Sequence, residues 1–314
     1  MGNSCCGNSI LREDSNHMED SIKNSSGLKM TLEDLEKMHK PPPKTAIKSV
    51  MNEISKHGMV VLAKRGAYKP NQAIAIKDIA ELPVLGPYRY EDGSTYTGQY
   101  RQGVRHGRGT QVWGDGSYYD GYWVQDRMDL KGRMISKGGD IYEGDFNGEV
   151  PEGEGRSESY EGVVYVGSFE RGKAHGQGQE TWRDGSEYKG RFKNGLKHGR
   201  GVFKMADGSS YEGDFFNNAK HGKGRLEYGD GRVYEGDFKL NKFEGHGAFE
   251  WSDGRRYTGD YRDDVKDGYG EFVWKDGRVY RGRWSKGKME GEGLLIDVHG
   301  NKTSGVWKEG ERVV

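Results

Sequence analysis

The chain has 314 residues, 32% of them apolar and 52 of them glycine, and its 49 basic and 49 acidic side chains give a formal net charge of zero. This balance argues against nucleic acid as the main partner, because phosphate binding requires a concentrated basic surface. The two cysteines are adjacent at positions 5 and 6, which predicts neither a disulfide framework nor a zinc site. With no bilayer-spanning apolar run and no secretory signal, the sequence predicts an intracellular protein.

The first nine residues, MGNSCCGNS, have the features of an acylation signal. Gly2 follows the initial methionine and precedes small polar residues, which suits N-myristoylation, and Cys5 and Cys6 offer palmitoylation sites. A single myristoyl chain binds membranes only weakly, and no basic cluster lies nearby, so palmitate would have to supply the second anchor. We expect residues 1–28 to form an acylated flexible tether; the alternative is an unmodified tail.

Residues 29–85 are expected to form a helical linker or cap. A TLED sequence resembles a capping box that opens a helix over 31–40, and three prolines end that helix. A second helix is expected from Thr45 and should stop at Gly58. Its apolar face would pack either on the repeats that follow, as a cap, or on a partner helix.

From residue 96 onward the chain repeats itself with a fixed period and without insertion or deletion, and the first nine repeats begin with tyrosine, at positions 96, 119, 142, 165, 188, 211, 234, 257 and 280. All ten repeats carry a glycine two residues after the start and an aromatic residue four residues after it. A strict period of this length predicts an array in which each unit buries its apolar face against its neighbours. We therefore expect the third domain, residues 86–314, to be an array of about ten repeats.

The repeat at 211–233 shows what each unit should build. Its opening YEGDF alternates aromatic or glycine residues with acidic ones, which predicts a strand with an aromatic face and a charged face. A polar turn, NNAKHG, is expected to run to Gly222, followed by a second strand from Gly224 and an Asp-Gly turn. The predicted fold is all-β: an elongated, single-layer antiparallel meander of tandem hairpins.

This unit resembles the MORN repeat (membrane occupation and recognition nexus). The resemblance rests on YEGDF at 211–215, HGKGRLEY at 221–228 and DG at 230–231. It covers residues 96–314, although the second, third and last copies depart from the pattern, and a partial unit at 88–96 precedes it. The resemblance implies a scaffold at the cell cortex, the cilium or flagellum, or a membrane–cytoskeleton junction, with a homodimer as one option.

Two sets of aromatic residues are predicted to have different roles. The opening tyrosines and the aromatics four residues later should form a buried structural ladder, most regular at Tyr188, Phe192, Tyr211, Phe215, Tyr234 and Phe238. Aromatics that we assign to the second strands should line a groove that binds a protein partner, with a helix as one candidate: Trp182, Tyr228, Trp251 and Trp274. The alternative is that all of these rings only pack the sheet itself.

No catalytic residue, metal site or cofactor is predicted. The recurring histidines at 106, 175, 198 and 221 are interpreted as turn residues, spaced about 9–10 Å from repeat to repeat, which is too far to share a zinc ion. Some proteins with such repeats also carry a lipid-kinase or methyltransferase domain, but none is expected here. The predicted function is a non-catalytic scaffold tethered to the cytoplasmic face of a membrane. The alternatives are a phospholipid-binding module and an axonemal structural subunit without a membrane role.

Overall fold

The computed structural model describes residues 51–70, 79 and 81–314. Gly2, Cys5 and Cys6, the helix expected at 31–40 and the start of the second expected helix lie outside these described residues. Their acylation and helical structure therefore stay predictions. The described residues divide into two compact units, and the boundary lies between Gly178 and Gln179.

The described residues contain the helix α4 (Lys56–Arg65) and 21 strands. The first unit holds β1 (Val84–Arg89), β2 (Thr95–Arg101), β3 (Val104–Val112), β4 (Tyr118–Val124), β5 (Arg127–Ile135), β6 (Ile141–Asn147), β7 (Val150–Glu158) and β8 (Val164–Glu170). The boundary falls within β9 (Lys173–Thr181). The second unit holds β10 (Glu187–Lys193), β11 (Leu196–Lys204), β12 (Ser210–Phe216), β13 (Ala219–Glu227), β14 (Val233–Lys239), β15 (Lys242–Glu250), β16 (Arg256–Arg262), β17 (Val265–Val273), β18 (Val279–Ser285), β19 (Lys288–Ile296), β20 (Lys302–Lys308) and β21 (Glu311–Arg312).

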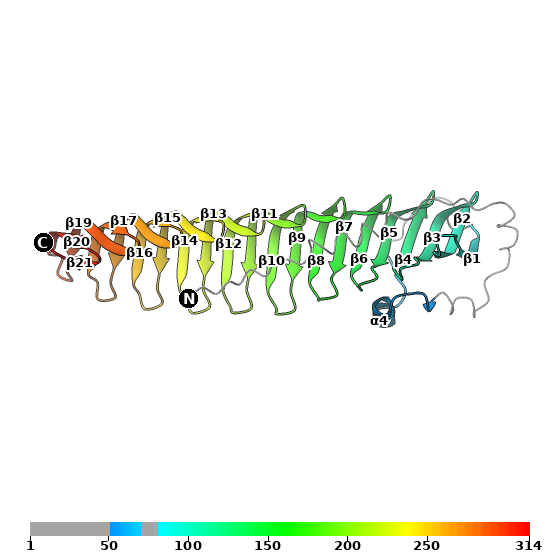
Figure 1. Ribbon diagram of the computed structural model, residues 1–314, viewed down its shortest axis with the longest axis horizontal. Coiled ribbons are helices and arrows are strands. Elements are labelled where there is room, and N and C mark those ends of the chain that lie inside the picture. The colour runs from blue at the N-terminus through cyan, green and yellow to red at the C-terminus, as the bar shows by residue number, and fades with distance from the viewer. Residues whose placement is uncertain (1–50, 71–78, 80) are drawn as a thin grey trace. The chain divides into compact units, whose positions relative to one another are not determined.

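The strands form one open antiparallel sheet of 21 strands. Strands that follow one another in the chain pair with one another, as β12 does with β13 and β13 with β14, and Figure 1 shows these hairpins succeeding each other in chain order. The second and third repeats, which depart from the sequence pattern, still form the paired strands β4–β5 and β6–β7. The prediction of an all-β antiparallel meander of tandem hairpins is confirmed.

The turn inside each hairpin is shorter than the sequence suggested. Between β12 and β13 the two turn residues are Asn217 and Asn218, with φ of 48° and 69°, the left-handed conformation that a two-residue hairpin turn requires and asparagine tolerates. The prediction that the turn runs to Gly222 is wrong, because β13 already begins at Ala219. The pairing of β12 with β13 shifts register just after Gly213, and this irregularity takes up the extra residues.

The turn between repeats follows the predicted Asp-Gly pattern. Between β13 and β14 the Tyr228 N–H donates to the Arg232 carbonyl at 2.8 Å, and the Gly231 N–H donates to the Tyr228 carbonyl at 2.9 Å. Gly231 has φ of 87°, a conformation that is costly for residues with a side chain. The glycine of the Asp-Gly pair is therefore what closes this turn.

The helix α4 was missed by the sequence analysis, which expected a helix to stop at Gly58. That expectation is wrong, because Gly58 lies inside α4. Ser55 caps the helix: its hydroxyl accepts a hydrogen bond from the Gly58 N–H at 3.0 Å, which starts a new helix at this point. The helix ends at Gly66, whose N–H donates to the Leu62 carbonyl at 2.8 Å.

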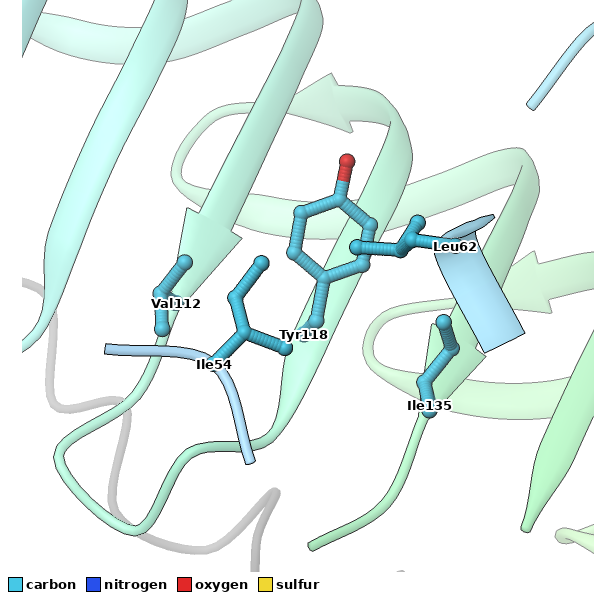
Figure 2. Packing of buried hydrophobic residues seen from close by; sticks show 5 residues of the cluster. All are labelled: Ile54, Leu62, Val112, Tyr118 and Ile135. Carbon is cyan, nitrogen blue, oxygen red and sulfur yellow. The ribbon is translucent and has the colours of Figure 1, made fainter. Parts of the chain in front are cut away.

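The segment around α4 packs on the first repeats through a small apolar cluster (Figure 2). Ile54 and Leu62 meet Val112 at the end of β3, Tyr118 at the start of β4 and Ile135 at the end of β5. All five residues are at most 9% exposed. Ile54, from the expected apolar stripe, is thus covered by this chain's own repeats rather than left free for a partner helix.

Polar contacts extend this packing beyond α4. The Tyr68 N–H donates to Asp120 Oδ2 at 2.9 Å, and Arg108 reaches the other oxygen of the same carboxylate at 2.7 Å. Burial raises the pKa of Asp120, and the Arg108 guanidinium opposes this rise. Arg65 forms ion pairs with Glu143 and Glu158. Residues 51–70 therefore cover the charged face of the first three repeats.

Candidate protein-binding face of the repeats

The aromatic ladder consists of the tyrosine that opens each repeat and the aromatic residue four positions later. In the sixth repeat the Tyr211 ring is fully buried, and its hydroxyl donates to the Asp214 carbonyl at 2.9 Å. The ring lies over paired glycines, since a Cβ added at Gly213 or Gly224 would come within 2.4 Å of the Tyr211 hydroxyl. These glycines are required inside strands because the tyrosine occupies the space of a side chain.

The ladder continues from repeat to repeat through edge-to-face contacts. The Phe215 ring lies 5.1 Å from that of Tyr211 and 5.0 Å from that of Tyr188 in the preceding repeat, at interplanar angles of 89° and 82°. Such pairs add stabilisation beyond simple burial, and burial raises the pKa of the tyrosine hydroxyls. The six residues assigned to the ladder are all nearly inaccessible: Tyr188 0%, Phe192 3%, Tyr211 0%, Phe215 4%, Tyr234 0% and Phe238 3%.

The four aromatics assigned to the groove are half-buried, and we call them the turn aromatics: Trp182, Tyr228, Trp251 and Trp274. Their placement in second strands is wrong, because each is the first residue after its strand and opens the turn between two repeats. They lie on the same side of the sheet as the ladder; the Trp251 ring, for example, is 4.5 Å from that of Phe249 and 5.7 Å from that of Phe272.

Three of the turn aromatics are in cation–π contact with an arginine from the same turn. The guanidinium carbon of Arg232 lies 4.5 Å from the Tyr228 ring centroid, and those of Arg255 and Arg278 lie 5.3 Å from Trp251 and Trp274. Each arginine is also paired with an aspartate two residues before it, at 2.8 to 2.9 Å. Ring, guanidinium and carboxylate therefore form a repeated stack that holds each ring in place.

A further row of side chains on this face was missed by the sequence analysis. It lies nine residues after each opening tyrosine, where the chain has Arg105, Met128, Pro151, Ala174, Lys197, Lys220, Phe243, Lys266 and Met289. These positions sit opposite the second ladder aromatic in the neighbouring strand, as Lys266 does opposite Tyr261. The sequence pattern predicts a polar turn for this segment, so its lysines were not expected on this face.

In the fifth repeat this row contributes a buried ion pair. Lys197 Nζ lies 2.6 Å from Glu180 Oε2, and the two side chains are only 10% and 2% exposed. The same ammonium lies 4.5 Å from the Trp182 ring centroid. The chain thus satisfies this buried lysine with a carboxylate from the neighbouring repeat.

In the eighth repeat the ammonium of the equivalent lysine lies among four aromatic rings. Lys266 Nζ lies 4.6 to 5.0 Å from the ring centroids of Trp251, Tyr257, Phe272 and Trp284. Within the described residues, the structure gives this ammonium neither a hydrogen bond nor an ion pair. Burial, with a smaller contribution from Arg255, lowers the pKa of Lys266 to about 8.

The opposite face carries ladders of exposed charge. Arg225 pairs with Glu235 at 3.1 Å, and Lys223 pairs with Asp237 at 2.7 Å, both across neighbouring strands. Exposed pairs of this kind contribute about 0–1 kcal/mol each.

The four recurring histidines lie on strands β3, β9, β11 and β13, so their assignment to turns is wrong.

Comparison with known families shows to which family the repeat array belongs. The family model of the MORN repeat matches eight segments, at residues 96–118, 119–141, 165–187, 188–210, 211–231, 234–255, 257–277 and 280–301, which together exceed half of the chain. The chain belongs to the MORN repeat family. The MORN model leaves the third repeat unmatched, in keeping with its departure from the pattern. A search of curated proteins finds no match.

Several solved structures are similar to the MORN array at low identity. A mutant TCP10 domain of Danio rerio CPAP is 13% identical, with a TM-score of 0.36 over 69% of this chain and 95% of that one. The CPAP G-box domain is 12% identical, with a TM-score of 0.34 over 64% and 100%. The Drosophila melanogaster SAS-4 TCP domain, solved with a proline-rich motif of Ana2, is 15% identical, with a TM-score of 0.28 over 62% and 99%. With TM-scores below 0.5, these similarities support no argument about the function of this MORN protein.

Across residues 51–70, 79 and 81–314, the structure groups no set of three or more His, Cys, Asp or Glu side chains that could hold a metal ion. In the same part of the chain, no helix has both the length and the apolar character needed to cross a membrane. The candidate binding face of the described MORN repeats is the side that bears the partly exposed turn aromatics and the lysine row.

Proposed function

We propose that this MORN protein is a non-catalytic scaffold whose repeats bind a protein partner through the turn aromatics. The observation that carries the proposal is the division of the rings into two sets. The ladder rings are buried and hold the hairpins together, whereas the turn aromatics remain partly exposed above them. Large rings with a polar edge are the side chains that most often dominate protein interfaces.

The spacing of the turn aromatics supports a helical ligand. Equivalent residues of adjacent hairpins lie two strand spacings apart, about 9–10 Å. Seven residues of an α-helix rise about 10.5 Å. A helix lying along consecutive turns such as those of Tyr228, Trp251 and Trp274 would therefore present one side chain per heptad to each ring.

Affinity purification from the native cell tests this proposal, with the full-length chain as bait. Trp251→Ala should lose the captured partner while the thermal midpoint changes little, because the ring is only half-buried. Phe216→Ala is the matched control, since Phe216 is 46% exposed and points to the other face of β12 from its neighbour Phe215. If Trp251→Ala loses stability together with binding, the ring is core and the partner surface lies elsewhere.

We further propose that acylation of Gly2, Cys5 and Cys6 holds this scaffold on the cytoplasmic face of a membrane, at the cell cortex, the cilium or a membrane–cytoskeleton junction. The zero net charge and the paired charges on the polar face support contact through acyl chains, because headgroup binding by the repeats would need clustered basic residues.

Cell fractionation tests the membrane proposal. Gly2→Ala should move the protein to the soluble fraction, and Cys5→Ser with Cys6→Ser should leave it weakly bound. An unchanged distribution of Gly2→Ala would contradict the anchor. Tight, salt-sensitive binding of purified Gly2→Ala protein to anionic liposomes would instead favour direct phospholipid binding by the repeats.

A further inference from the structure

The fifth repeat shows which chemical group its buried lysine accepts. Lys197 lies on β11, and its ammonium meets both the Glu180 carboxylate at the end of β9 and the Trp182 indole that follows this strand. The ion pair is nearly inaccessible to solvent. A carboxylate set beside the ammonium and the tryptophan ring is therefore compatible with the geometry of this face.

The eighth repeat has the same arrangement without the carboxylate. Lys266 lies on β17 and is 5.0 Å from the ring of Trp251, the turn aromatic equivalent to Trp182. Phe249 stands two positions before Trp251, in the place that Glu180 has before Trp182. Rings surround the ammonium, and no acidic side chain reaches it within the described residues. Because burial of an uncompensated charge is unfavourable, an anion supplied from outside would be stabilised here.

The next turn between repeats follows β17 and begins at Trp274. A shallow hollow there is lined by Arg255, Trp274, Lys275 and Asp276. The hollow adjoins Lys266 through Arg255, which is close enough to lower the pKa of the lysine. A ligand seated over these rings would thus reach two turn aromatics and a surplus of positive charge.

We propose that Lys266 binds an aspartate or glutamate side chain of the partner protein, from a segment that lies over Trp251 and Trp274. This inference rests on the proposed function and names the partner's charge at one position. A carboxylate fits the site better than a phosphate group, because the arginines that could clamp a phosphate, Arg255 and Arg278, are already paired with Asp253 and Asp276.

Proton binding supports the same assignment. The titratable groups that the structure places near Lys266 are the Arg255 guanidinium, which is paired with Asp253, and the phenols of Tyr257 and Tyr261. Burial raises the pKa of both phenols. Since the pKa of Lys266 is about 8, a carboxylate ligand should raise it by stabilising the ammonium. Affinity for that ligand should accordingly fall as the pH rises above about 8.

NMR of the lysine side chains in the full-length protein tests the site with a defined probe, N-acetylglutamate. Lys266→Met assigns the signal and is tolerated by the fold, because Met128 and Met289 occupy the same place in other repeats. N-acetylglutamate should shift the Lys266 signal saturably and raise its pKa, whereas N-acetylglutaminamide, in which both carboxylates are replaced by neutral amides, should do neither. No shift, an equal shift with the amide, or a response to inorganic phosphate alone would overturn the proposal.

An internal carboxylate provides the matched control. Phe249→Glu reproduces the arrangement of Glu180 and Lys197, so it should raise the pKa of Lys266 and abolish the response to N-acetylglutamate. Phe249→Gln has nearly the same shape without the charge and should leave the response in place. If both variants respond as the parent does, the equivalence of the two sites is wrong.

The partner itself separates this inference from the proposed function. Lys266→Met should weaken partner binding by about 30-fold or more, because the partner's carboxylate would be buried unpaired, whereas Lys220→Met should not. If the parent captures a partner and Lys266→Met binds it equally well, the inference fails and the proposed function stands. If Trp251→Ala also leaves partner binding unchanged, the proposed function fails as well.

Discussion

The fifth and eighth repeats share one ladder but differ in the partner that they give to the lysine nine residues after the opening tyrosine. Both bury their opening tyrosines, Tyr188 and Tyr257, completely. In the fifth repeat the chain supplies Glu180 to Lys197, while in the eighth the Lys266 ammonium lies among aromatic rings, without an ion pair to a described residue. The repeat therefore uses its ladder for stability and leaves the neighbouring row free to vary.

The difference indicates where to look for function in a periodic protein. Positions that recur in every repeat, such as the ladder and its glycines, are explained by packing. A position that keeps the same charge but loses its partner is not explained by packing, because an unpaired buried charge opposes folding. Lys266 is such a position, and it lies beside the turn aromatics.

The largest expected effect concerns what the two repeats share. Phe192→Ala in the fifth repeat and Tyr261→Ala in the eighth each remove a ladder ring that packs edge-to-face on a buried tyrosine. Each should lower the free energy of unfolding by about 3–5 kcal/mol, measured by chemical denaturation. A loss confined to one of the two variants would show that the ladder is not equivalent in the two regions.

Loss of the internal carboxylate should have the next largest effect. Glu180→Gln leaves Lys197 buried without a counter-ion and should cost about 3 kcal/mol. The control is Glu227→Gln, whose exposed pair with Arg225 should contribute at most about 1 kcal/mol. Equal losses from the two variants would mean that the pair of Glu180 and Lys197 is not buried in solution.

Substitution of the paired glycines under the ladder should have the third largest effect on stability. Gly201→Ala would place a Cβ 2.4 Å from the Tyr188 hydroxyl oxygen, and Gly270→Ala would place one 2.5 Å from the Tyr257 ring. Each substitution should cost about 1–3 kcal/mol. Gly114→Ala is the control, because its nearest neighbour would be 3.5 Å away. Thermal melts of the three variants compare both regions directly, and an unchanged midpoint for Gly201→Ala or Gly270→Ala would contradict the close approach.

The smallest expected effect on stability is that of replacing Lys266, and it should be stabilising rather than destabilising. Lys266→Met removes an unpaired, partly buried charge, so stability at neutral pH should be unchanged or slightly higher. The parent protein should gain stability between about pH 8 and pH 10.5, because the folded state releases the Lys266 proton near 8 while the unfolded state keeps it to 10.5. This gain should be missing in Lys266→Met, and a gain of the same size in both proteins would assign it to other groups.

The ladder and the hairpins could be predicted from the sequence because they follow its 23-residue period. The positions of single residues around the turns could not be predicted as well from the sequence. His221 and Gly222 were predicted to belong to the turn after β12. Asn217 and Asn218 alone form this turn, and His221 and Gly222 belong to β13.

The missed parts depend on contacts between residues that no local pattern connects. Lys197 on β11 and Glu180 on β9 meet only because adjacent hairpins pair in one register. The helix α4 follows a Ser55 cap, which the sequence shows, but its position depends on Leu62 meeting Tyr118 and Ile135 far along the chain. The sequence therefore predicted the aromatic residues of the candidate site, but it did not predict the lysines and carboxylate beside them.

The central claim is that a protein partner lies over the turn aromatics, and site-specific photo-crosslinking in the native cell tests it most directly. Photo-reactive p-benzoylphenylalanine would replace Trp274 in one full-length protein and Phe216, exposed on the other face, in a second. The account predicts a discrete crosslinked partner from position 274 and none from position 216. A partner crosslinked only from position 216 would contradict it.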